Sequence, residues 1–205
     1  MTRIFGHDAH FQSFAKAMAS GRLHHGWILA GPRGVGKAGF AQEAARMLVD
    51  PENRYASMVD HHTHPDIIWV QRLPKEAPKE GESADPDAEL KRSIAIDQIR
   101  SVQHSLTTRP SMGPKRVVII DAADDLERGG ANALLKSLEE PPVGTYFMLV
   151  SHASDRLLPT IRSRCQVMRF EALGDAEMQQ ALLQALPQAS TSEVDALVRS
   201  GRGLP

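Results

Sequence analysis

The sequence predicts an α/β fold in which helices wrap a parallel β-sheet. Short apolar runs alternate with amphipathic helical segments along most of the chain, the pattern of strand–helix–strand units. The run "WILA" leads into the glycine-rich loop "GPRGVGK", and the run "VVIID" is apolar until its final aspartate. Runs of this kind are typical of strands buried on both faces. A chain of 205 residues is long enough to bury one such core.

The first elements follow from hydrophobic spacing. We expect an N-terminal helix that stops at Gly21, then the strand "WILA", then a helix that starts at Gly36 and ends near "DPEN". The apolar faces of the two helices are Phe11, Phe14, Ala15 and Met18 in the first, and Phe40, Ala44, Ala45 and Leu48 in the second.

A second strand, "DIIWVQ", precedes a segment of different composition. Residues 73–90 are rich in Pro, Glu and Asp and poor in large apolar side chains, so they cannot bury enough surface to order themselves. We expect a solvated, disordered insertion here, and a role in partner binding stays open because long loops are often functional.

The second half continues the alternation. "RSIAIDQIRSVQHSLTTRP" predicts a short extended piece and a helix capped by Asp97, and "KRVVIIDAAD" predicts a buried strand. "GGANALLKSLEEPP" predicts a helix ended by a proline pair, and "TYFMLVS" another strand. "PTIRSRCQVMRF" predicts a helical turn and a last strand.

The pattern changes after Phe170. "DAEMQQALLQAL" and "TSEVDALVRS" predict two amphipathic helices, the second with a Thr/Ser start followed by Glu193. We therefore expect a core over residues 1–170 and the start of a separate helical unit over 171–205. The sequence stops before that unit could close, which suggests a fragment.

Composition excludes several classes of protein. The formal net charge of −1 gives no global attraction to nucleic acid, and 5% aromatic residues disfavour a base-stacking platform. The single cysteine, Cys165, excludes a disulfide framework and fits a reducing compartment. No leader and no apolar run of membrane-spanning length is visible, so we expect a soluble cytoplasmic protein.

The loop after "WILA" matches the phosphate-binding pattern G-x-x-x-x-G-K through Gly31, Gly36 and Lys37. Backbone N–H groups at a helix start present partial positive charge to phosphates, and the lysine adds a full charge. The next position usually supplies a hydroxyl to Mg²⁺, but here it is Ala38, so phosphate binding should survive better than catalysis. The candidate phosphate-binding residues are Gly31, Pro32, Arg33, Gly34, Val35, Gly36, Lys37 and Ala38.

Asp121, at the end of "VVIID", suits the carboxylate that holds Mg²⁺ through water in phosphate-loop enzymes. In hydrolysing members of many such families a glutamate follows and polarises the attacking water, but here Ala122 follows. Asp124 and Asp125 lie too far along to share that geometry. The alternative is that Asp121 only caps its strand.

Three segments together, "LHHGWILAGPRGVGKAGFAQEAARML", "VVIIDAADDLERGGANALLKSLEEPP" and "LLPTIRSRCQVMRF", resemble the AAA+ clamp-loader subunits of bacterial DNA polymerase III, and among them the delta-prime type. The resemblance runs from about Ile4 to the end. It implies a RecA-like AAA+ core, a three-helix lid of which this chain holds part, and a C-terminal collar domain absent from this sequence.

The resemblance also implies roles for single residues. "SRC" corresponds to the arginine-finger motif, so Arg164 would reach the nucleotide of a neighbouring subunit, where an always-charged guanidinium can bridge phosphate oxygens. Ser163 would position the turn and Cys165 would pack inside as a small hydrophobic residue. Ser151 and His152 correspond to the sensor-1 position, although the family usually has Asn or Thr there. The alternative for Arg164 is a surface ion pair.

One departure from the family concerns zinc. Relatives of this type often carry four zinc-binding cysteines after the phosphate-loop helix, and the corresponding segment here has none, so we expect no zinc. Asp60, His61, His62 and His64 could ligate a metal in principle, but neighbouring residues rarely converge on one ion.

The resemblance and the two alanines favour a non-hydrolysing subunit. Its implied partners are gamma/tau and delta subunits and, through the complex, the sliding clamp and primer-template DNA; ATP or ADP with Mg²⁺ would bind weakly or not at all. One alternative is an active AAA+ ATPase, either the motor subunit of the same assembly or a stand-alone enzyme. A second is a small-molecule kinase. A third is a DNA-binding module using the basic residues Arg100, Arg109, Lys115 and Arg116.

Overall fold

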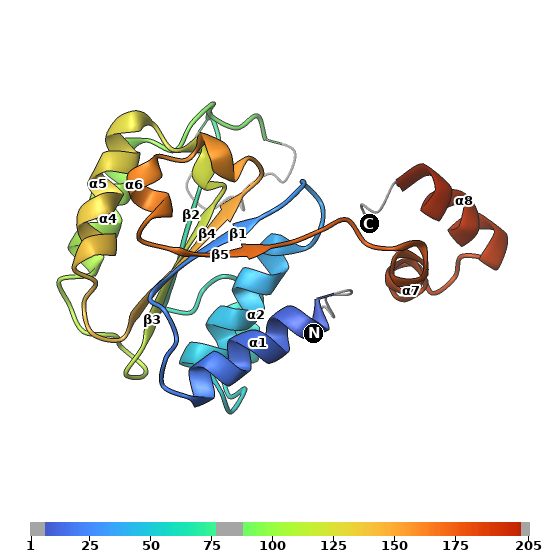
Figure 1. The fold of residues 1–205 in the computed structure, drawn as a ribbon, viewed down its shortest axis with the longest axis horizontal. Helices are drawn as coiled ribbons and strands as arrows, with labels where there is room; N and C mark the ends of the chain where they lie inside the picture. The colour runs from blue at the N-terminus through green and yellow to red at the C-terminus, as the bar shows by residue number, and fades with distance from the viewer. Residues whose placement is uncertain (1–6, 77–87, 202–205) are drawn as a thin grey trace.

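The structure, a computed structural model, describes residues 7–76 and 88–201. Its centre is a five-stranded sheet with the order β2-β3-β4-β1-β5, and every neighbouring pair of strands is parallel (Figure 1). The predicted α/β fold with a parallel sheet is confirmed. The strands are β1 (Gly26–Ala30), β2 (Ile67–Gln71), β3 (Arg116–Asp121), β4 (Thr145–Ser151) and β5 (Gln166–Arg169).

Helices cover both faces of this sheet. Figure 1 shows α1 and α2 on one face and α4, α5 and α6 on the other. The helices are α1 (Asp8–Ala19), α2 (Lys37–Val49), α3 (Ala56–Asp60), α4 (Ile96–Ser105), α5 (Arg128–Glu139), α6 (Pro159–Arg162), α7 (Asp175–Ala185) and α8 (Thr191–Gly201), with short 3-10 turns at Ala123–Asp125 and Ser154–Arg156.

The strands divide their side chains between two hydrophobic clusters, because successive side chains of a strand point to opposite faces. In β3, Val117 and Ile119 belong to the cluster that contains Phe14 of α1 and Phe40 of α2. Val118 and Ile120 belong to the cluster that contains helix α5. A strand buried on both faces needs apolar residues at every position, which explains the continuous apolar run.

The start of α4 differs from the prediction. The helix begins at Ile96 after Ala95, which has extended backbone angles, so Asp97 lies inside the first turn and is not the cap. The Gln98 side chain accepts a hydrogen bond from the Ala95 N–H at 3.2 Å, and Asp97 instead pairs with Arg100 at 3.0 Å. The one-turn helix α3 was not predicted either.

The ends of the predicted 73–90 insertion are paired. Pro74 and Leu90 form an antiparallel bridge, with the Lys75 N–H donating to the Glu89 carbonyl at 2.7 Å. Backbone pairing needs no apolar side chains, so the predicted disordered range was too wide at both ends. Residues 77–87 lie outside the described residues, and their disorder stays a prediction.

Helices α7 and α8 pack on each other around a small cluster of their own. Leu173, Met178 and Ala181 are buried there, and Gln179 donates to Asp195 across the pair at 3.0 Å. The separate helical unit and its boundary with the core stay predictions. Across residues 7–76 and 88–201, the helices are too short or too polar to cross a bilayer.

Candidate functional site

The predicted phosphate loop lies between β1 and α2, at the carboxyl edge of the sheet. Gly36 has a φ of +87°, a left-handed conformation that glycine adopts without strain, and α2 begins at the next residue. At Gly31 a Cβ atom would lie 2.2 Å from the Phe170 carbonyl oxygen, so only glycine fits. Both glycines of the motif are therefore required by the loop's shape.

Lys37 is buried in this loop, with 3% of its surface exposed. Its Nζ donates to the carbonyl oxygens of Gly31, at 2.8 Å, and of Pro32. Burial lowers the pKa of Lys37, and the nearby carboxylates of Asp121 and Asp124 partly offset this effect. The ammonium group thus lies within the loop that would surround a phosphate.

Asp121 is the last residue of β3, at the same edge of the sheet. Strand β3 is the direct neighbour of β4, and β4 lies between β3 and β1. Burial raises the pKa of Asp121, while His152, Lys37 and Arg33 act in the opposite direction. The Asp121 carboxyl group therefore interacts electrostatically with His152, Lys37 and Arg33. The structure brings the predicted carboxylate and the predicted phosphate loop together.

Asp124 has a role that the sequence did not indicate. Its carboxylate accepts the Ser151 hydroxyl at 2.9 Å, the His152 N–H at 2.6 Å and the Ala153 N–H at 3.2 Å. Asp124 thereby holds the predicted sensor segment at the end of β4. The contact joins residues distant in sequence, so no local pattern could have revealed it.

The second nearby carboxylate is also engaged. Asp125 pairs with Arg72 at 3.1 Å, so both Asp124 and Asp125 are engaged in contacts other than the role of the glutamate expected at position 122. This agrees with the expectation that they do not share the catalytic geometry.

The fold family implies Mg²⁺ beside such a loop, and the donor set here does not fit it. Ala38 offers a methyl group where a hydroxyl would bind the metal, and Asp124 and Asp125 are occupied. Asp121 remains, but burial raises its pKa despite the nearby cations Lys37 and Arg33. We therefore derive no catalytic step through a metal at this site.

Arg164 lies at the opposite edge of the sheet. It belongs to the turn between α6 and β5, and a Cβ on Gly26, the first residue of β1, would lie 3.2 Å from its carbonyl oxygen. The phosphate loop follows the other end of β1. A five-residue strand spans about 13 Å, so the length of β1 separates the Arg164 backbone from the phosphate loop of its own chain.

The neighbouring Cys165 behaves as expected. It packs against the cluster on the α5 face, and burial raises the pKa of its thiol to about 12. At ordinary pH the thiol is therefore protonated and unreactive.

The histidines considered as possible metal ligands have other contacts. His61 Nδ1 lies 2.7 Å from the Ser57 carbonyl, His62 stacks on Trp69, and His64 Nδ1 accepts the Asp66 N–H at 3.1 Å. In the part of the chain that the structure describes, no three His, Cys, Asp or Glu side chains gather to hold a metal.

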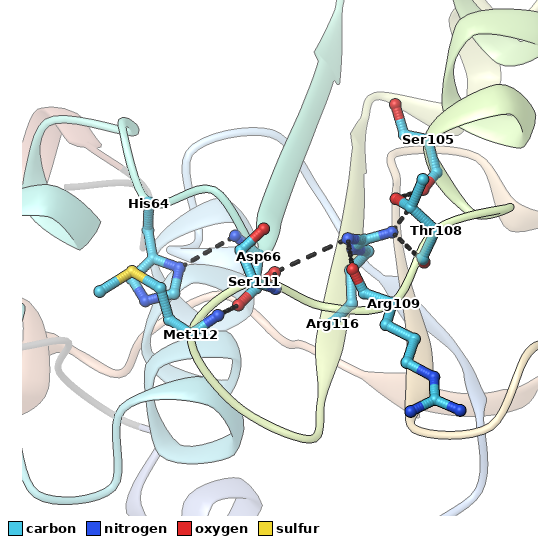
Figure 2. A network of polar contacts seen from close by, with 8 residues as sticks. All are labelled: His64, Asp66, Ser105, Thr108, Arg109, Ser111, Met112 and Arg116. Carbon is cyan, nitrogen blue, oxygen red and sulfur yellow. Dashed lines mark hydrogen bonds and ion pairs between the residues drawn. The ribbon is translucent and has the colours of Figure 1, made fainter.

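The predicted basic patch is not a single exposed surface. Arg116 is 5% exposed and donates to the carbonyls of Ser105 at 2.5 Å, Thr108 at 3.1 Å and Arg109 at 3.0 Å (Figure 2). Its other partner is Asp66, at 3.7 Å. Arg116 is therefore a structural residue that fixes the loop before β3, and its buried side chain is not available to the DNA-binding alternative.

Two cavities lie away from the phosphate loop. One of about 500 Å³ lies between the carboxyl ends of α4 and α5, and one of about 710 Å³ lies at the junction of α7 and α8.

Comparisons with known proteins point to one family. The family model described as "DNA polymerase III, delta subunit" matches residues 6–174. DNA polymerase III subunit delta' of Pseudomonas aeruginosa is 32% identical over 88% of this chain and 53% of its own length. The Escherichia coli subunit of the same name is 30% identical over 77% of this chain and 45% of its own length.

Other relatives and solved structures are more distant. DNA polymerase III subunit tau/gamma of Haemophilus influenzae is 28% identical over 90% of this chain and 26% of its own. The RuvB Holliday junction branch migration motor of Thermotoga maritima shares the fold, with a TM-score of 0.60 at 16% identity over 98% of this chain and 58% of its own.

The delta' matches cover most of this chain but only about half of each relative. The family match spans the phosphate loop, the Asp121 strand and the arginine turn described above. The chain belongs to the DNA polymerase III delta-subunit family, and its similarity to delta' subunits confirms the resemblance inferred from the motifs.

Proposed function

We propose that this protein is a non-hydrolysing clamp-loader subunit of the delta-prime type, which presents Arg164 to the ATP of a neighbouring subunit while a sliding clamp is loaded onto primer-template DNA. The neighbours would be gamma/tau and delta subunits of the same assembly, in the cytoplasm.

The observation that carries this proposal is the separation of Arg164 from its own phosphate loop. The two lie at opposite ends of β1, and the Arg164 side chain contacts α5 and α6 of its own chain. An arginine in this place is unsuited to its own site, but it is partly exposed and available to a second protein.

A guanidinium is suited to the role. It stays charged at all relevant pH values and presents several N–H donors to phosphate oxygens as negative charge develops. An arginine supplied in trans contributes about 10³ to 10⁵ in rate to phosphoryl transfer in other nucleotide hydrolases. A subunit that does not hydrolyse ATP itself can therefore control ATP hydrolysis at the site of the neighbouring subunit.

The phosphate loop of this chain would bind ATP or ADP without hydrolysing it. The loop geometry and Lys37 are retained, while Ala38 and Ala122 remove the metal hydroxyl and the glutamate. A second candidate, an active ATPase, is favoured by the gamma and tau/gamma relatives and by the intact loop. The two alanines argue against it.

The test uses the full chain assembled with the ATPase subunits of its clamp loader. We expect Arg164→Ala to lower the kcat for ATP at the adjacent site by about 10³-fold, as for other arginines of this kind. The control, Arg162→Ala, changes an exposed arginine of α6 in the same turn. Unchanged turnover with Arg164→Ala, in a complex that still assembles, contradicts the proposal.

A further inference from the structure

Two of the three segments that carry the family resemblance contact each other in the folded protein. Arg164 of "SRC" pairs through its Nη2 atom with Oε1 of Glu139, the last residue of α5 and the first glutamate of "EEPP", at 2.5 Å. Helices α5 and α6 lie side by side in Figure 1. The assignment of Arg164 as a finger does not by itself explain why its turn lies against the end of α5.

The Arg164 guanidinium is held from a second side. Its Nη1 donates to the Thr160 carbonyl at 2.9 Å and to the Ser163 hydroxyl at 3.3 Å. A free arginine side chain loses rotamer entropy when it becomes ordered. Contacts on two sides, to Glu139 and to Thr160 and Ser163, limit the rotamers before any ligand binds.

Both partners of the ion pair stand on rigid parts of the fold. Ile161 of α6 is 1% exposed, and Gly26 leaves room for the arginine turn where a Cβ would lie 3.0 Å from the Cys165 sulfur. On the α5 side, His25 Nε2 lies 2.9 Å from the Leu138 carbonyl, one residue before Glu139. The remaining freedom is therefore mainly that of the two side chains.

The pair is also accessible. About 33% of the Arg164 side chain and 48% of the Glu139 side chain are exposed. A guanidinium has five N–H donors, and the contacts to Glu139, Thr160 and Ser163 leave some of them for another acceptor. A surface pair of this kind adds little to folding stability, so its main effect is on orientation.

We propose that Glu139 is a positioning residue for Arg164: it holds the guanidinium in the orientation in which it meets the phosphate of a nucleotide bound by the neighbouring subunit. This rests on the proposed function. The effect follows from preorganisation, because a side chain already in place loses less entropy when it binds.

The kinetic test compares variants in the assembled complex. We expect Glu139→Ala to lower kcat for ATP about tenfold with KM changed less than twofold, since misplacement of a group that acts on the transition state affects kcat. Glu139→Gln, which keeps a hydrogen-bond acceptor, should recover part of the loss. Glu140→Ala is the matched control, because Glu140 is the next exposed glutamate and forms no ion pair within the described residues.

A double variant separates positioning from a general structural effect. In an Arg164→Ala background, Glu139→Ala should cause no further loss. An equal loss in both backgrounds would mean that Glu139 acts elsewhere. A rise in kcat for Glu139→Ala would also overturn the proposal, since it would make Glu139 a restraint on the arginine.

A measurement on the chain alone distinguishes this proposal from the proposed function. We expect the NMR order parameter of the Arg164 Nε–H to fall in Glu139→Ala while that of the backbone is unchanged. If Arg164 loosens but Arg164→Ala leaves ATP turnover unchanged, the proposed function fails and the contact stands as structural. If Arg164 does not loosen, the positioning proposal fails whatever the function.

Discussion

The two edges of the parallel sheet differ in what they have kept. At the carboxyl edge, the phosphate loop retains its glycines and Lys37. Alanines occupy the positions where a metal-binding hydroxyl and a catalytic glutamate are expected. Asp124 accepts hydrogen bonds from the sensor segment. At the amino edge, Arg164 is anchored by its own helices and partly exposed.

In our proposal, catalysis has been lost at the carboxyl edge while phosphate binding is retained. Phosphate cradling depends on backbone shape, which the fold preserves because Gly31 must pass close to Phe170. Hydrolysis depends on a few side chains, which can be exchanged without disturbing that shape. In our proposal the amino edge supplies the chemistry that the carboxyl edge no longer performs.

The largest expected effect is the difference in ATP turnover between a substitution at the carboxyl edge and one at the amino edge. In the assembled complex, Lys37→Ala should leave ATP turnover at the neighbouring site within about twofold, while Arg164→Ala lowers it about 10³-fold. Steady-state ATPase assays measure both. A large loss with Lys37→Ala would show that the chain's own loop takes part in turnover.

A stability experiment compares a buried charge at each edge. Arg116, at the amino edge, is paired with Asp66 and three carbonyls, so Arg116→Met should lower the free energy of unfolding by about 3–5 kcal/mol. Denaturant unfolding measures it.

The matched change at the carboxyl edge is Asp121→Asn. Burial raises the pKa of Asp121, so its ionised form destabilises the folded state. The free energy of unfolding therefore decreases as pH rises from the ordinary value of 3.8 through the raised pKa. We therefore expect Asp121→Asn to leave stability at pH 7 unchanged or raised. A loss comparable to that of Arg116→Met would contradict this contrast.

A binding experiment sharpens the account of the carboxyl edge. Because the donor set does not fit Mg²⁺, the calorimetric Kd for ADP should change by less than about twofold between Mg²⁺ and EDTA. Lys37→Ala should weaken binding, and Ala38→Thr should make it depend on Mg²⁺. Binding that requires Mg²⁺ in the unmodified chain would show that the metal finds other ligands.

The smallest effect is a pH dependence shared by both edges. Burial lowers the pKa of His152 at the carboxyl edge and of His25 at the amino edge below 6.5. As pH falls through 6.5, the unfolded chain takes up protons that the folded chain does not, so unfolding free energy should decrease until the lower folded pKa values are reached.

Single variants apportion this decrease. His25→Gln and His152→Gln should each flatten the dependence of unfolding free energy on pH between about 7.5 and 5. If neither variant changes the slope, other groups carry the titration.

Much of the fold could be predicted because its signals are local. The glycine spacing, the apolar run ending in Asp121 and the proline pair after α5 each lie within a short stretch. One error was local and one was not. Asp97 looked like a cap, but the helix begins at Ile96 and the Gln98 side chain accepts the Ala95 N–H. Arg116 looked like part of a basic surface, because the distant Asp66 that pairs with it was not apparent from the sequence.

By itself the sequence determined the order of the elements, the phosphate loop with its missing hydroxyl, and the arginine motif. Only the tertiary structure decided that Asp124 holds Ser151 and His152 at the carboxyl edge and that Glu139 pairs with Arg164 at the amino edge. The reason is geometric. A parallel sheet brings all strand ends of one kind together, so side chains distant in sequence become neighbours through strand order, which no local pattern records.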